Sequence, residues 1–213
     1  GNGREVSPND SRMDKTDSKK KAGISRVLIP EKVYIDPEHT VTLSPFLTAI
    51  TGIDALCHCI EGYTNKYSHP MVEIYAIEGM RLIGKNLLTT VHKSEDIKGR
   101  EAMSMGSYYG GLCLGPVNTT AVHALAYPLG SEYHISHGLA NAVLLPHVMR
   151  FNYNFAIKRY AEVATAIGAK VCDTEAETAL EGIEIISDII KMCKIPSSLR
   201  ELNIPESSIP DLA

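Results

Sequence analysis

The stretch SPFLTAITGIDALCHCIE, which runs from Ser44 to Glu61, decides the fold of this chain. Ser44 followed by Pro45 is typical of a helix start, because serine caps the first turn and proline suits its first position. The helix is expected to weaken or end near Gly62 or Asn65. Apolar residues recur within it at helical spacing, namely at Leu47, Ile50, Ala55 and Cys59.

Helical patterns continue along the rest of the chain. The third expected helix is rich in small residues, which would let a neighbouring helix approach closely. We expect the fourth helix to be closed by Gly130 and the fifth to be interrupted by Pro146. The body is therefore predicted to be mainly α, with helices at Met71–Leu88, Ile97–Leu112, Thr119–Leu129, His137–Met149, Phe155–Ile167 and Glu175–Cys193.

Residues 1–40 have a different character, because they are polar and interrupted by prolines. Two short extended stretches are expected at Ile24–Leu28 and Lys32–Ile35. Two such strands do not form a stable sheet alone, so we expect their partners to lie upstream of this sequence. The polar start GNGREVSPND is not a signal peptide and reads like the middle of a longer protein.

Composition excludes several classes of function. The net charge of −4 argues against nucleic acid as a partner, and no apolar run is long enough to span a membrane. Five cysteines without regular spacing do not form a disulfide framework. A reducing cytoplasm fits this usage best.

Asp54 and His58 form the first half of a candidate metal site. They are four residues apart, so a helix places them on one face, one turn apart. Such pairs are also common on exposed helix surfaces. Here, however, the neighbours are apolar, and a buried Asp needs a partner. Glu61, three residues further on, is a candidate to support these ligands.

His123 and His137 are candidates for the other half of the site. Three imidazoles and one carboxylate form a mixed nitrogen–oxygen set that suits Fe²⁺, Zn²⁺, Ni²⁺ or Co²⁺. The alternative is that the histidines are structural and bind no metal. Cys57 and Cys59 point in different directions on a helix and are better explained as small buried residues.

Three motifs resemble the iron-containing (group III) alcohol dehydrogenase family. They are TGIDALCHCIE from Thr51, HALAYPLG from His123 and HGLANAVLLPH from His137. The resemblance implies a helical, dehydroquinate synthase-like domain that holds Fe²⁺. It carries the family's ligands over to Asp54, His58, His123 and His137.

The family also has an N-terminal α/β domain that binds NAD or NADP. The resemblance implies that residues 1–40 are a remnant of that domain and its linker. It further implies that residues 41–213 are the helical domain, truncated at its C-terminus. Gly1, Asn2 and Gly3 match a loop that touches the cofactor, and Lys20 lies near a lysine that approaches the ribose.

This sequence departs from the family pattern at several positions. Asn2 and Arg4 stand where Thr and Ser are usual in the cofactor loop. Tyr127 stands where many members have a histidine assigned to proton relay. A tyrosine can donate a hydrogen bond but is a poor base at neutral pH, so His134 is an alternative relay residue.

The implied activity is hydride transfer between a small alcohol or aldehyde and NAD(P), with the metal acting as a Lewis acid. A homodimer is also plausible from the resemblance. Because the cofactor domain is expected to be absent, a second hypothesis stays open. The chain would then be a non-catalytic metal-binding or assembly module derived from that family.

Overall fold

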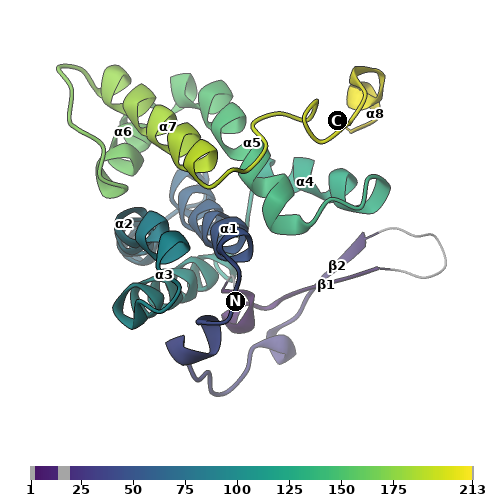
Figure 1. Ribbon diagram of the computed structural model, residues 1–213, viewed down its shortest axis with the longest axis vertical. Coiled ribbons are helices and arrows are strands. Elements are labelled where there is room, and N and C mark those ends of the chain that lie inside the picture. Colours follow the sequence, from purple (N-terminus) through teal and green to yellow (C-terminus); the bar gives the residue numbers. More distant parts are fainter. Residues whose placement is uncertain (1–2, 14–19, 213) are drawn as a thin grey trace.

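The computed structural model describes residues 3–13 and 20–212, and most of them are helical (Figure 1). This confirms the predicted mainly α fold. The helices are α1 (Pro45–Thr64), α2 (Pro70–His92), α3 (Ile97–Leu114), α4 (Ala121–Glu132), α5 (His137–Asn152), α6 (Ile157–Ala166), α7 (Glu175–Met192) and the short α8 (Ile209–Leu212).

α1 is the central helix of the fold. It begins as predicted, since the Ser44 hydroxyl accepts a hydrogen bond from the Leu47 N–H at 3.2 Å and Pro45 is its first residue. It contacts α2, α3, α5 and α6, so nearly every residue from Thr48 to Tyr63 is buried. A helix that is apolar on most sides belongs inside a protein, and its few buried polar residues therefore need a specific explanation.

Two expected helix breaks are wrong. Gly130 lies inside α4, which runs on to Glu132, and Pro146 lies inside α5, which runs on to Asn152. A proline removes one backbone hydrogen bond from a helix. Leu145 and Met149, on either side of Pro146, are fully buried, and this packing outweighs the lost hydrogen bond.

The small residues of α3 allow close approach, as the sequence predicted. A Cβ atom on Gly106 would lie 2.6 Å from Cγ1 of Ile83 on α2. A Cβ atom on Gly110 would lie 2.9 Å from the Ala55 carbonyl oxygen on α1, and one on Gly111 would lie 1.9 Å from the Gly3 carbonyl oxygen. The backbone of α3 thus packs directly against a side chain of α2 and against the backbone of α1 and of Gly3.

The predicted strands are wrong in position. The two observed strands, β1 (Asn9–Met13) and β2 (Lys20–Ile24), pair antiparallel with Asn9 opposite Ile24. Residues 26–28 form a 3₁₀ turn, and residues 32–35 have no regular structure. In the described part of the chain residues 26–35 pair with no strand, so extended backbone there has no pairing partner. Val27 and Tyr34 are accordingly exposed.

None of the helices in residues 3–13 and 20–212 is both long and apolar enough to cross a membrane.

Gly84 gives a test of the helix packing. A Cβ atom there would meet the Ile167 carbonyl oxygen at 2.7 Å and the Ile167 Cα at 2.8 Å. Because this obstacle is backbone, Gly84→Ala should lower the free energy of unfolding by about 1–3 kcal/mol. A Cβ atom on Gly130 would meet only the Ile135 carbonyl oxygen, at 3.6 Å. Gly130→Ala should be neutral, or stabilising by up to ~1 kcal/mol. Urea unfolding measures both, and equal effects would contradict this packing.

Candidate metal centre

The four predicted ligands come together at one point between three helices. Asp54 and His58 lie on α1, His123 on the first turn of α4, and His137 at the start of α5. Nε2 of His58, His123 and His137 lies 4.0, 3.4 and 3.5 Å from Oδ1 of Asp54. Nε2 of His123 also lies 3.0 Å from Nε2 of His58. The ligand atoms of Asp54, His58 and His123 all lie within 4.8 Å of one another, and His137 joins them through Oδ1 of Asp54.

The centre is buried on one side and reaches the surface on the other. Asp54, His58 and His123 are each 1% exposed, whereas the His137 side chain is 18% exposed. Among the four described ligands, His137 is thus the one that solvent reaches most.

The buried carboxylate and imidazoles shift one another's protonation. Burial alone would raise the pKa of Asp54, but the charge of His58 and the hydrogen bond with His123 outweigh it and hold that pKa well below its ordinary value. Burial alone would lower the pKa of His123, but its contacts with Asp54 and Glu61 raise that pKa to about 8. The ionised Asp54 supplies a negative charge where the three imidazoles converge.

Glu61 lies behind His123. Its Oε2 is 2.5 Å from Nδ1 of His123, and its Oε1 accepts hydrogen bonds from the Thr120 hydroxyl and the Val122 N–H, each at 2.8 Å. Burial opposes ionisation of Glu61, but these contacts outweigh it and lower its pKa. The predicted supporting role is consistent with this geometry.

Asn141 is a site residue that the sequence reasoning missed. It is fully buried, and its Nδ2 lies 2.5 Å from Oδ1 of Asp54 and 3.1 and 3.2 Å from Nε2 of His123 and His137. Among the described residues its Oδ1 has no partner. The only signal in the sequence was that Asn141 lies four residues, or one helical turn, after His137. Many asparagines lie one turn from a histidine without any shared role.

The residues present fit a divalent cation. Three imidazole nitrogens and one carboxylate oxygen are ligands for Fe²⁺, Zn²⁺, Ni²⁺ or Co²⁺. The partially positive amide NH₂ of Asn141 lies where their lone pairs converge, as expected where a cation is favoured. The buried Oδ1 of Asn141 has no hydrogen-bond partner among the described residues, which costs free energy, and it is one more oxygen that can bind a cation.

The two predicted relay residues differ in position. The Tyr127 ring lies 6.4 Å from the His137 ring, nearly parallel to it at 25°, so Tyr127 stands beside the open side of the centre. His134 is exposed in the turn after α4, with a φ of 55°. Within the described chain, no hydrogen bond, ion pair or ring contact joins it to the four ligands. Both roles remain predictions.

The predicted cofactor residues are described only in part. Gly1 and Asn2 lie outside the described residues, as does the side chain of Lys20, whose backbone begins β2. Gly3 is described, and its φ of +85° together with its contact with α3 allows only glycine there.

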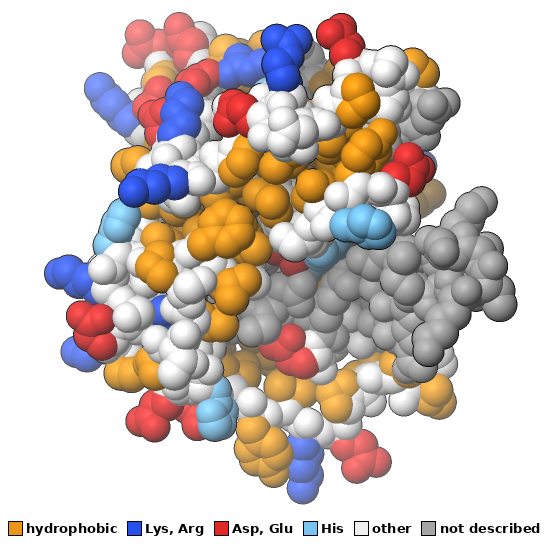
Figure 2. All heavy atoms as spheres, turned by 45° about the vertical axis from the view of Figure 1, so that its right-hand side comes forward, with side chains coloured by type: hydrophobic (Ala, Val, Ile, Leu, Met, Phe, Trp, Pro, Cys, Tyr) orange, Lys and Arg blue, Asp and Glu red, His pale blue; other side chains and the backbone are white. Residues whose placement is uncertain are grey.

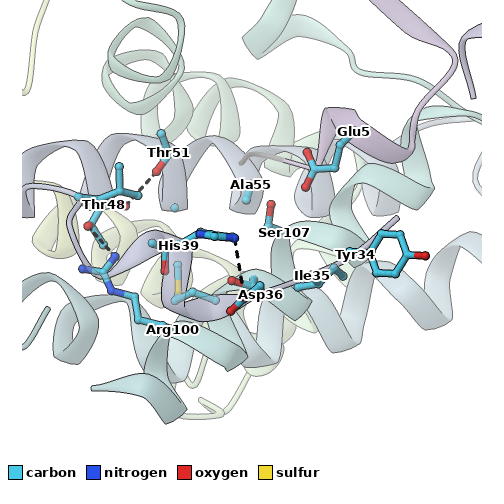
Figure 3. Close-up of a pocket in the computed structure, with 15 residues that line it drawn as sticks. Glu5, Tyr34, Ile35, Asp36, His39, Thr48, Thr51, Ala55, Arg100 and Ser107 are labelled. Atoms are coloured by element: carbon cyan, nitrogen blue, oxygen red, sulfur yellow. Dashed lines mark hydrogen bonds and ion pairs between the residues drawn. The ribbon is translucent and has the colours of Figure 1, made fainter. Parts of the chain in front are cut away.

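A separate cavity of about 310 Å³ lies on another side of α1 (Figure 3). Thr48 and Thr51 from α1 and Arg100 from α3 line it, and none of the four candidate ligands does. Arg100 is 2% exposed and donates to Thr48 at 2.9 Å and to the Ser94 carbonyl at 3.0 Å. The sequence reasoning did not single out this cavity.

Comparisons with known proteins agree with the fold. Long-chain-alcohol dehydrogenase 1 of Geobacillus thermodenitrificans is 37% identical over 186 residues, which are 87% of this chain and 47% of that protein. Alcohol dehydrogenase 4 of Saccharomyces cerevisiae is 37% identical over 196 residues, 91% of this chain and 50% of that protein. The crystal structure of a 1,3-propanediol oxidoreductase superposes with a TM-score of 0.95 at 32% identity, covering 98% of this chain and 55% of that one.

The chain thus spans about half the length of the curated relatives it matches. The family model for the C-terminal part of the Fe-containing alcohol dehydrogenases matches residues 48–213. This match runs from Thr48, in the first turn of α1, through α8 and includes all four candidate ligands. The chain therefore belongs to the Fe-containing alcohol dehydrogenase family.

Proposed function

We propose that Asp54, His58, His123 and His137 bind one divalent cation, Fe²⁺ in the native protein, with Zn²⁺, Ni²⁺ or Co²⁺ as alternatives. The observation that carries this proposal is the convergence of their ligand atoms on the buried carboxylate of Asp54. When bound, the cation supplies Lewis-acid polarisation of an alcohol or carbonyl oxygen.

We further propose that the protein takes part in NAD(P)-dependent interconversion of small alcohols and aldehydes. The chain's own residues would position the substrate oxygen on the open side, beside His137 and Tyr127. Figure 2 shows hydrophobic side chains gathered in the middle of the face that carries α4 and α5, with histidine side chains beside them. This surface suits the apolar part of an alcohol.

The names of the relatives support alcohol and aldehyde chemistry but not one substrate. They include a long-chain-alcohol dehydrogenase, a lactaldehyde reductase, a 1,3-propanediol dehydrogenase and an NAD-dependent methanol dehydrogenase. Three of these four names denote compounds of one to three carbons. We therefore propose the class, and leave the individual alcohol to experiment.

We also propose that residues 1–40 belong with a nucleotide-binding unit and residues 41–213 with the metal-binding unit. A reducing cytoplasm suits the five cysteines, which are all free thiols, and the homodimer remains a prediction. The alternative function is a metal-binding or assembly module without catalysis.

One experiment separates these two functions. The chain is purified without oxygen, its metal content is measured, and NADH or NADPH is added with a short aldehyde while nicotinamide absorbance is followed. Turnover would support the dehydrogenase and exclude the non-catalytic module. One metal per chain without turnover would support the module, and no metal would contradict both.

A further inference from the structure

The carboxylate of Glu61 links α1 to α4. Its Oε1 accepts hydrogen bonds from the Val122 N–H and the Thr120 hydroxyl, and its Oε2 lies 2.5 Å from Nδ1 of His123. Glu61 is only 2% exposed, so both oxygens have their contacts inside the protein. One side chain thus meets a backbone donor, a hydroxyl and a metal-ligand candidate at once.

Glu61 caps a helix that is not its own. The first N–H groups of a helix have no partner within the helix. Thr120 stands at the capping position of α4, but its side chain does not cap α4 and donates instead to Glu61. The Glu61 carboxylate accepts the Val122 N–H in its place, where the helix dipole also favours a negative charge. The contact therefore fixes the start of α4, which carries His123.

The same carboxylate determines which nitrogen of His123 carries the proton. An ionised carboxylate only accepts hydrogen bonds, so the neighbouring Nδ1 must be the donor. In the neutral ring the lone pair is then on Nε2. That atom faces Oδ1 of Asp54 at 3.4 Å and Nε2 of His58 at 3.0 Å.

We propose that Glu61 is a positioning residue, which caps α4 and fixes His123 in the tautomer whose Nε2 can bind the cation. This inference rests on the metal centre proposed above. It extends that proposal to a residue that touches neither the cation nor the substrate. Such carboxylate–histidine–metal arrangements set the orientation and basicity of a ligand.

Glu61→Gln tests this role because it changes hydrogen-bonding without changing shape. The Val122 N–H can only donate, so the amide oxygen of Gln must keep the place of Oε1. The amide NH₂ then faces Nδ1 of His123 and donates to it. This donation moves the His123 proton to Nε2 and removes the lone pair that the cation needs.

We expect Glu61→Gln to weaken Co²⁺ or Zn²⁺ binding by ~10–100-fold, measured by titration calorimetry. Thr120→Val is the matched control, because it removes one contact to Oε1 and leaves the Glu61–His123 pair intact. Its metal affinity should stay close to that of the wild type. Equal affinities for Glu61→Gln and wild type would overturn the proposal.

A second measurement reads the tautomer without metal or activity. Long-range ¹H–¹⁵N spectra of the metal-free protein are recorded across the pH titration of the His123 ring, and the proton is located in the neutral form of the ring. The wild type should carry its proton on Nδ1 and Glu61→Gln on Nε2. A wild-type proton on Nε2 would overturn the inference, even if Glu61→Gln failed to fold. A wild type that binds no metal would instead overturn the proposed function.

Discussion

Asp54→Ala is expected to abolish stoichiometric metal binding. Asp54 is the only anionic member of the four-residue set, and each of the three imidazoles has its Nε2 within 4.0 Å of Oδ1. Removing a residue that supports a ligand costs 10–100-fold in metal affinity, so removing the charged ligand itself should cost more than ~100-fold. That loss corresponds to at least ~2.7 kcal/mol of binding free energy.

The measurement is anaerobic elemental analysis of purified protein, followed by calorimetric titration with Fe²⁺ or Co²⁺. Asp188→Ala is the control, since Asp188 is a solvent-exposed carboxylate on α7 that pairs with Lys191 at the surface. It should bind metal like the wild type. Full metal content in Asp54→Ala would show that the cation, if present, is held elsewhere.

Removing the metal should lower thermal stability by a large and reversible amount. The four ligands come from α1, α4 and α5, so a bound cation joins three helices in the folded state only. At a free metal concentration of 100 times Kd, binding adds about 2.7 kcal/mol to the stability. For a chain of this size, that should raise Tm by roughly 5–10 °C.

Circular dichroism melts with and without a chelator measure this shift. Zn²⁺ or Co²⁺ should raise Tm, whereas Mg²⁺, which prefers oxygen ligands, should leave it nearly unchanged. In Asp54→Ala neither ion should have an effect. An equal rise with Mg²⁺, or no rise with any ion, would contradict the predicted ligand set.

The local parts of this centre could be predicted from the sequence. The spacing of Asp54 and His58 depends only on the helix repeat, and Ser44 and Pro45 define where that helix begins. Asn141 could not be found in this way. Its amide becomes part of the centre only because α5 packs against α1, and one-turn spacing from His137 describes countless ordinary asparagines.

The failed predictions share a physical cause. The propensities of Gly130 and Pro146 favour helix ends, but tertiary packing of their buried neighbours holds both helices together. The stretches at residues 24–28 and 32–35 have the composition of strands, yet a strand also needs a neighbour with free backbone groups. Local sequence patterns therefore predicted the helices correctly. They misplaced the strands and predicted breaks in α4 and α5 that the structure does not have.

Gly110 and Gly111 bring one turn of α3 against two separate neighbours at once. A Cβ atom on Gly110 would lie 3.2 Å from Cβ of His58, and one on Gly111 would lie 1.9 Å from the carbonyl oxygen of Gly3. The ligand helix and the N-terminal segment are therefore seated on the same two residues of α3. A substitution at either glycine must displace one of these neighbours, so the two glycines tie the position of a candidate ligand to that of the N-terminal segment.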